Sequence, residues 1–319
     1  MAYKVLIPQD IAEDGKKYLT DRGYKIKMGS GISVDSMVKD VENCDAIIAR
    51  TALYPKEVLE AGKKLKVIGR HGVGVDNIDI KVATELGIYV TNAPLSNANS
   101  VAEHAIGLII AVARNMIHCD KELRGGNFEI RNQIHGFDLE DKTLGLVGLG
   151  SIGTLVAKKA TYGLNMKVIA YDPFVNQEGV IQEVELVDTR EAVFKNADFV
   201  SLHLPVTEET RRSIGKKEFE MMKSTAFLIN TARGEVVHEE ELIEALKLKM
   251  IAGAGLDVYQ SEPPEKNNPL FNLNNVVLTP HNAAHTKEAA QRMSLHAAIG
   301  VHEVLSGQKP SWPVNNPKG

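Results

Sequence analysis

The sequence is poor in cysteine and in long apolar runs. Its 319 residues include only Cys44 and Cys119, and neither stands near other ligand-type residues at the spacing of a metal site. A disulfide framework and a bound metal ion are therefore not expected, and the composition fits a reduced cytoplasm. No apolar run reaches the roughly 18 residues that a membrane span needs. We expect a cytoplasmic protein with no membrane partner.

An excess of positive charge is also missing. The chain has 37 Lys and Arg against 41 Asp and Glu, which gives a net charge of −4. Nucleic-acid-binding domains usually gather their basic residues into a patch. Here those residues are scattered, and Lys63, Lys64 and Lys66 are interpreted as a solvated face. No nucleic-acid partner is expected, and the length favours two domains.

The first hundred residues alternate between strand-like and helical stretches. This rhythm predicts a parallel sheet covered by helices. Because the first turn lacks a G-x-G-x-x-G sequence, we expect a flavodoxin-like unit and not a second dinucleotide site. The strand-like runs are 3–8, 25–28, 45–50, 65–70 and 88–92, with helical stretches such as 11–22 and 55–63 between them.

Residues 144–153 carry the most specific motif. An apolar run enters a G-x-G-x-x-G turn at Gly148, Gly150 and Gly153, a helical stretch follows, and the next apolar strand ends in Asp172. These glycines allow a tight turn, close approach of a pyrophosphate and packing of helix on strand. An acid at 172 would bind a ribose diol and repel a 2′-phosphate. The pattern predicts NAD, the alternative being a glycine-rich turn of another α/β protein.

The remaining segments complete the predicted organisation. Residues 100–114 read as a buried helix with Ser100 as N-cap and Glu103 at capping-box spacing, and 125–140 as an irregular arm. A long helix over 286–305 is expected to return to the first domain. The predicted fold is α/β with two domains: a Rossmann NAD-binding domain, 100–285, inserted in a flavodoxin-like substrate domain, 1–99 and 286–319.

Strands of the second domain are expected at 167–171, 199–202, 225–230, 253–257 and 276–278. Four polar residues lie at or after the ends of the last three. Arg233 comes after TAFLIN, Asp257 ends GAGLD with Glu262 in the next loop, and His281 follows VVLTP. Ligands bind at this edge of open α/β sheets. Arg233 offers a planar fork for a carboxylate, and His281 can give a proton to a carbonyl oxygen as hydride reaches the carbon. Glu262 would hold the imidazole, and Asp257 would accept from the nicotinamide carboxamide.

Each residue also has a plainer interpretation. Arg233 alone would be an ion-pair residue, and Glu262 a solvated charge in a Pro-rich loop. Most of the ten histidines are interpreted as incidental, among them His71 and His104. The shared position of the four polar residues at one sheet edge favours hydride transfer to a 2-keto acid.

In the first domain, residues 70–79 read RHGVGVDNID. Its glycines would expose backbone N–H groups at a strand end, which is typical of an anion-binding nest, although a tight structural turn explains them as well. Arg50 ends the neighbouring strand and could reach the same space.

In these motifs the chain resembles the D-isomer-specific 2-hydroxyacid dehydrogenases over essentially its whole length. The motifs lie at 72–76, 148–153, 231–234, 256–263 and 279–281. The resemblance implies an NAD-dependent oxidoreductase that interconverts a D-2-hydroxy acid and its 2-keto acid. It implies catalytic Arg233, Glu262 and His281 and substrate binding by Arg50, Val73 and Gly74. It places the cofactor contacts at Gly148, Gly150, Ser151, Ile152, Gly153, Asp172, Leu204, Thr231, Ala232, Asp257 and Ala283.

Within the family, residues 69–77 and 50–52 look most like phosphoglycerate dehydrogenases, whose arginine at this place lies near the substrate phosphate. This favours 3-phosphoglycerate and phosphohydroxypyruvate. Hydroxypyruvate and glyoxylate reductases share the catalytic motifs and remain an alternative, since Asn282 and His285 depart from the residues often seen there. Many relatives carry a C-terminal regulatory domain, and feedback through one is not expected in a chain that ends at Gly319.

An alternative from another class also remains. Some relatives are NAD-sensing corepressors that use the fold as a binding switch, which predicts a peptide-binding surface and extra tails. The complete Arg, Glu and His set favours an enzyme. Family members usually dimerise through the cofactor domain, and the arm at 125–140 would suit a homodimer.

Overall fold

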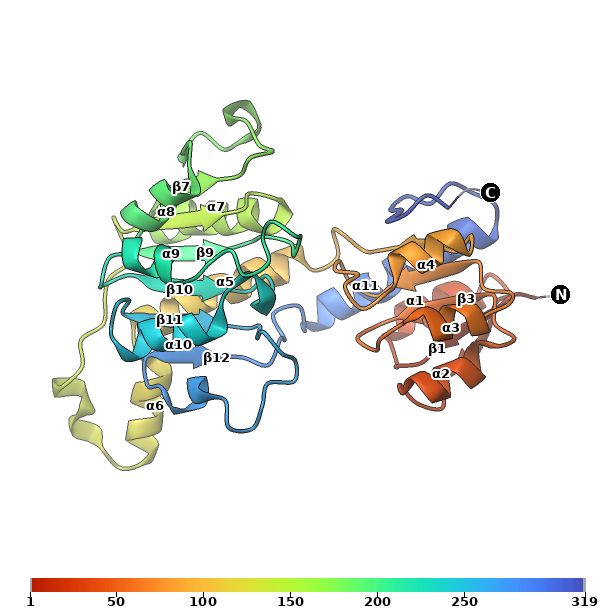
Figure 1. Cartoon of the computed structure of the whole chain (residues 1–319), viewed down its shortest axis with the longest axis horizontal. Coiled ribbons are helices and arrows are strands. Elements are labelled where there is room, and N and C mark those ends of the chain that lie inside the picture. The colour runs from red at the N-terminus through yellow and green to blue at the C-terminus, as the bar shows by residue number, and fades with distance from the viewer. Residues whose placement is uncertain (1, 318–319) are drawn as a thin grey trace. The chain divides into compact units, whose positions relative to one another are not determined.

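The computed structural model describes residues 2–317, which divide into two compact units. The first unit comprises the chain up to Asn97 and from Ala284 onward, and the second unit is Ala98–Ala283. These boundaries lie two residues from the expected ones. Figure 1 shows that each unit is built around its own sheet.

The sheet of the first unit has five parallel strands in the order β2-β1-β3-β4-β5. This is the flavodoxin-like order that the sequence predicted. The order reverses between β1 and β3, so the chain leaves these two strands in opposite directions at the carboxyl edge. The strands are β1 (Lys4–Ile7), β2 (Lys25–Met28), β3 (Ala46–Ala49), β4 (Val67–Arg70) and β5 (Tyr89–Thr91).

Helices cover both faces of this sheet. One face carries α1 (Glu13–Thr20) and α11 (Lys287–Leu305), which pack on each other. The backbone of α11 approaches β4 closely, because a Cβ added at Gly69 would lie 2.6 Å from the carbonyl oxygen of Ala297. The other face carries α2 (Val34–Val41), α3 (Lys56–Ala61) and α4 (Ile80–Glu85).

The sheet of the second unit has seven parallel strands in the order β12-β11-β10-β9-β6-β7-β8. This doubly wound order reverses between β6 and β9, as the Rossmann prediction requires. The predicted strand bounds agree with the structure to within two residues, but β8 was missed. The strands are β6 (Thr143–Val147), β7 (Lys167–Tyr171), β8 (Val184–Leu186), β9 (Phe199–Leu202), β10 (Phe227–Asn230), β11 (Gly253–Leu256) and β12 (Val276–Leu278).

Two layers of helices enclose the second sheet (Figure 1). One core cluster joins the sheet to α5 (Ala98–Ala113) and α7 (Ser151–Leu164), and the other joins it to α8 (Arg190–Asn196), α9 (Lys216–Met221) and α10 (Glu239–Lys247). Helix α6 (Met116–Arg124) and the turn that follows extend away from the sheet. Short 3₁₀ turns lie at Phe128–Asn132, Gln177–Gly179, Gly234–Val236 and Pro269–Asn272.

The prediction for the start of α5 was wrong. The helix begins at Ala98, and Ser100 is a buried residue inside its first turn. Glu103 accepts a hydrogen bond from Asn99 Nδ2 at 2.7 Å instead of closing a capping box with Ser100. The expectation of a buried helix is confirmed, since most residues of α5 are inaccessible to solvent.

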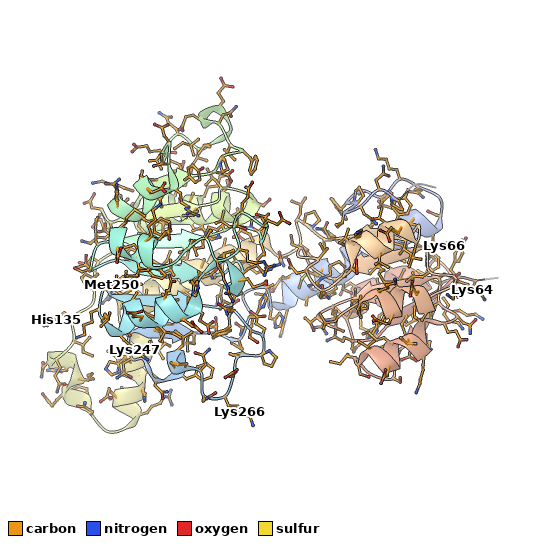
Figure 2. The ribbon with its side chains drawn as sticks, viewed as in Figure 1. Lys64, Lys66, His135, Lys247, Met250 and Lys266 are labelled. Carbon is orange, nitrogen blue, oxygen red and sulfur yellow. The ribbon has the colours of Figure 1, made fainter. Side chains whose placement is uncertain are left out.

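Surface features agree with the charge pattern. Lys63, Lys64 and Lys66 are exposed, and Figure 2 shows Lys64 and Lys66 projecting outward from the first unit. Within residues 2–317, no single helix combines the length and the apolarity to cross a membrane. Helices α5 and α6 pass that test only as a pair, which is bent by 61°.

Two glycines of α7 make a matched test of packing. A Cβ at Gly153 would lie 2.4 Å from the carbonyl oxygen of Gly148, whereas a Cβ at Gly163 would meet nothing within 4 Å. Gly153→Ala is expected to lower the free energy of unfolding by about 1–3 kcal/mol through overpacking. Gly163→Ala is expected to raise it by about 0.5–1 kcal/mol. Urea denaturation measures both, and equal effects of the two variants would contradict the packing seen here.

Candidate active site

A close imidazole–carboxylate pair lies beyond the carboxyl ends of β11 and β12. His281 Nδ1 is 2.5 Å from Glu262 Oε2, and both side chains remain partly exposed. Burial disfavours the charged form of Glu262, but the hydrogen bond from His281 and its charge outweigh burial and hold the pKa of the carboxyl below its usual value. With Nδ1 facing the carboxylate, Nε2 is the nitrogen left for a ligand.

The turn that carries His281 is held by a buried carboxylate. Asp257 is 0% exposed, and its oxygens accept from the backbone N–H groups of Asn282 at 3.0 Å and Ala283 at 2.9 Å. The Thr279 hydroxyl is 2.6 Å from Asp257 Oδ1. These bonds fix a turn in which His281 has a φ of 51°, a conformation that L side chains rarely adopt.

Tyr259 is a supporting residue that the sequence interpretation missed. Its backbone N–H donates to Glu262 Oε1 at 3.1 Å, and its hydroxyl donates to the Thr279 carbonyl oxygen at 3.0 Å. Burial and the charges of Asp257 and Glu262 raise the pKa of Tyr259 to about 12, so the phenol stays a donor. No local pattern marks such a residue, because its partners are defined only by the fold.

Arg233 lies in the turn after β10. Its Nη1 donates to the Ala232 carbonyl oxygen at 2.7 Å, and Asn230 Nδ2 donates to the Arg233 carbonyl oxygen at 2.9 Å. The charge of Arg233 is the smallest of the named causes that lower the pKa of the Glu262 carboxyl. The turn packs tightly, since a Cβ on Gly234 would lie 1.9 Å from the backbone of Tyr259. The structure thus brings Arg233, Glu262 and His281 together.

The glycine-rich turn has the geometry of a phosphate site. Gly148 has a φ of +97°, and a Cβ there would lie 2.6 Å from the His203 carbonyl oxygen. A Cβ at Gly150 would meet nothing within 4 Å, so space remains above the turn. Helix α7 begins at Ser151 without a side-chain cap, which leaves its first N–H groups, including that of Ile152, to an anion. These residues fit the pyrophosphate of a dinucleotide.

Asp172 follows β7 beside this turn. Its Oδ2 accepts from the Leu149 N–H at 2.8 Å and its Oδ1 from the Phe174 N–H at 2.9 Å. Two backbone bonds orient the carboxylate and leave lone pairs on both oxygens for a ribose diol. Three further residues predicted to contact the cofactor also follow strands of this sheet. Leu204, after β9, is half-buried, and Ala283, after β12, is buried. Thr231, after β10, has a buried Oγ1 with no hydrogen-bond partner within residues 2–317.

In the first unit, the loop after β4 turns its carbonyl groups inward. The carbonyl oxygens of residues 72–74 accept from the Ala93 N–H at 2.8 Å, Asn92 Nδ2 at 2.8 Å and Arg70 Nε at 2.7 Å. No acceptor within residues 2–317 bonds the N–H groups of Val73 and Gly74, which suits the predicted anion nest.

Arg50 lies after β3, next to the point where the strand order of the first sheet reverses. Its Nη1 donates to the Asp10 carbonyl oxygen, in the loop after β1, at 2.5 Å. The remaining guanidinium N–H groups can donate to a ligand at this edge of the sheet, where open α/β folds bind ligands. Arg50, Val73 and Gly74 thus belong to the first unit, and the reactive pair and the dinucleotide turn belong to the second.

Known proteins share both the sequence and the fold. The chain is 42% identical to the D-3-phosphoglycerate dehydrogenase of Archaeoglobus fulgidus, over 98% of this chain and 59% of the relative. It is 39% identical to the hydroxypyruvate reductase of Thermotoga maritima, over 95% of this chain and 98% of the relative. The chain spans about three fifths of the length of the archaeal phosphoglycerate dehydrogenases it matches.

The comparison of structures agrees with these relatives. The TT0316 protein of Thermus thermophilus superimposes with a TM-score of 0.91 at 34% identity, covering 98% of this chain and 100% of that one. Residues 106–283 match the family model described as D-isomer specific 2-hydroxyacid dehydrogenase, NAD binding domain. The chain belongs to the D-isomer specific 2-hydroxyacid dehydrogenase family.

Proposed function

We propose that this chain is an NAD-dependent dehydrogenase that interconverts a D-2-hydroxy acid and its 2-keto acid, with 3-phosphoglycerate and phosphohydroxypyruvate as the favoured pair. The observation that carries the reaction class is the His281–Glu262 bond of 2.5 Å beside Arg233 at one sheet edge. Asp172 favours NAD over NADP, because a carboxylate repels a 2′-phosphate.

The residues divide the work of keto-acid reduction. NADH, when bound, supplies the hydride to the carbonyl carbon. Arg233 binds the carboxylate and carbonyl oxygens of the substrate through its planar fork. His281 gives its Nε2 proton to the carbonyl oxygen, and Glu262, bonded to Nδ1, fixes the tautomer and stabilises the imidazolium. In the reverse reaction His281 accepts the proton from the hydroxyl group.

Substrate identity depends on the first unit. Arg50 favours a phosphorylated acid, and the nest at Val73 and Gly74 would bind the substrate carboxylate. The similarity to relatives named D-3-phosphoglycerate dehydrogenase also favours a phosphorylated acid. The relatives named hydroxypyruvate and glyoxylate reductase match this chain over nearly their whole length, which supports a reductase of unphosphorylated keto acids as the second candidate.

One assay tests the proposal. NADH and NADPH oxidation are followed with phosphohydroxypyruvate, hydroxypyruvate, glyoxylate and pyruvate. Turnover with NADH supports the dehydrogenase, and the ratio of kcat/KM values ranks the substrates. Tight NADH binding without turnover of any acid supports a corepressor-like binding protein instead.

His281 should be the proton donor. Replacing it with Ala removes the group that protonates the carbonyl oxygen, so His281→Ala should lower kcat by about 10²–10⁴-fold. The NADH dissociation constant, measured by fluorescence titration, should change little. His285→Ala is the matched control, because His285 is an exposed histidine four residues away. Normal turnover in His281→Ala would remove His281 from the mechanism.

Arg50 tests the phosphorylated substrate. Arg50→Ala should cost about 1.5–3 kcal/mol in kcat/KM for phosphohydroxypyruvate, the size of a charged hydrogen bond, and leave glyoxylate reduction nearly unchanged. Steady-state kinetics with both acids measure the difference. Equal losses would show that Arg50 acts structurally through Asp10, and absent turnover of the phosphorylated acid would favour the reductase.

The same proposal includes a homodimer formed through the predicted arm at 125–140 together with helix α6, which precedes it; from here on, the arm means both segments. Helix α6 buries no residue, and Met116, Ile117, Leu123 and Phe128 are each more than half exposed. Of these four, Ile117 also lines a cavity of about 380 Å³, together with His135 and Phe137 and with residues of edge strand β12 (Figure 2 labels His135). Apolar surface of this kind marks an association site, and a second copy of the chain suits it because homodimers bury such patches symmetrically.

We place the dimer in the cytoplasm, without nucleic-acid or membrane partners.

Charge on the arm should break this dimer. Phe128→Asp with Ile117→Asp places two carboxylates in the proposed interface, so light scattering after gel filtration should show half the mass of the unmodified protein. Leu248→Asp, at an exposed leucine after α10, should leave the mass unchanged. A monomeric unmodified protein, or an unaltered mass in the double variant, would contradict the arm as the interface.

A further inference from the structure

Helix α5 carries a histidine that contacts the turn bearing His281. His104 Nε2 lies 2.9 Å from Thr279 Oγ1, and Thr279 Oγ1 lies 2.6 Å from Asp257 Oδ1. The distance from His104 Nε2 to Asp257 Oδ1 is 3.6 Å. The sequence interpretation treated His104 as incidental, because its partners are far away along the chain.

The other bonds of Asp257 show which atom donates in each hydrogen bond that links His104, Thr279 and Asp257. Each oxygen of Asp257 already accepts a backbone N–H bond, which is the behaviour of an ionised carboxylate. The Thr279 hydroxyl therefore donates to Asp257. Its oxygen then offers only lone pairs to His104, so His104 Nε2 must carry a proton and donate.

This chain of bonds holds both ends of the turn around His281. Thr279 begins the turn, and its carbonyl oxygen also accepts from the Tyr259 hydroxyl. Asp257 fixes the end of the turn through the two residues after His281. Between them, His281 adopts a φ of 51°, which local preference disfavours and which the surrounding bonds must maintain.

We propose that His104 is a positioning residue for the reaction. By donating to the Thr279 oxygen, His104 orients the threonine hydroxyl toward Asp257. This keeps the turn in place and holds the His281 imidazole at hydrogen-bond distance from Glu262. The side chain of His104 is 24% exposed, so helix α5 holds it in place while one edge stays accessible. This inference rests on the proposed function, in which His281 is the proton donor.

Two variants of His104 separate positioning from packing. His104→Gln keeps an N–H donor at similar reach, whereas His104→Leu fills the space without a donor. His104→Leu is expected to lower kcat about 5- to 20-fold, because small displacements of a reacting group are costly, with the KM for NADH changed less than about twofold. His104→Gln is expected to recover kcat to within about threefold of the unmodified enzyme.

A measurement without substrate keeps the two proposals distinct. In protein labelled with ¹⁵N-histidine, NMR should show the His104 proton on Nε2 and the His281 proton on Nδ1, and His104→Leu should shift or broaden the His281 ring signals. A His104 proton on Nδ1 alone, or His104→Leu with unaltered kcat and unaltered His281 signals, overturns the positioning role. Absent turnover in the unmodified protein, with the His281 signals still dependent on His104, would reject the proposed function alone.

Discussion

The buried carboxylate of Asp257 is the constraint that shapes the proposed active site at the carboxyl edge of the second sheet. An isolated carboxylate in the protein interior is costly, and here hydrogen bonds from the Thr279 hydroxyl and two backbone N–H groups offset that cost. The same bonds impose the shape of the turn and leave His281 in a left-handed conformation facing Glu262. The burial of one charge and the orientation of one imidazole are therefore a single structural feature.

The parallel topology explains why these groups meet. All seven strands of the second sheet run in one direction, so every loop after a strand emerges at the same edge. The dinucleotide turn follows β6, Arg233 follows β10, and His281 follows β12. Close backbone packing then fixes the spacing of the loops, because the contacts at Gly148 and Gly234 leave no room for a Cβ. Glycine at those positions is a requirement of the packing.

Periodic and motif-based features could be predicted from the sequence, and contacts between distant residues could not. Strands β7, β9 and β12 agree with the predicted bounds because their apolar runs are interrupted by turn residues. The start of α5 failed because a capping pattern is local, while the first turn is set by packing that buries Ser100. The support given by Tyr259 and His104 joins residues up to 175 positions apart, and no pattern in the chain encodes such a contact.

The division of the chain into two units also separates two questions about its chemistry. The groups suited to proton and hydride transfer come from loops of the second sheet, which lies within the residues that match the family's NAD-binding domain. The residues proposed to select the substrate also come from loops after strands, but of the first sheet: Arg50 follows β3, and the nest at Val73 and Gly74 follows β4. The groups proposed for proton and hydride transfer thus lie in the second unit, and the polar groups proposed to select the substrate lie in the first unit.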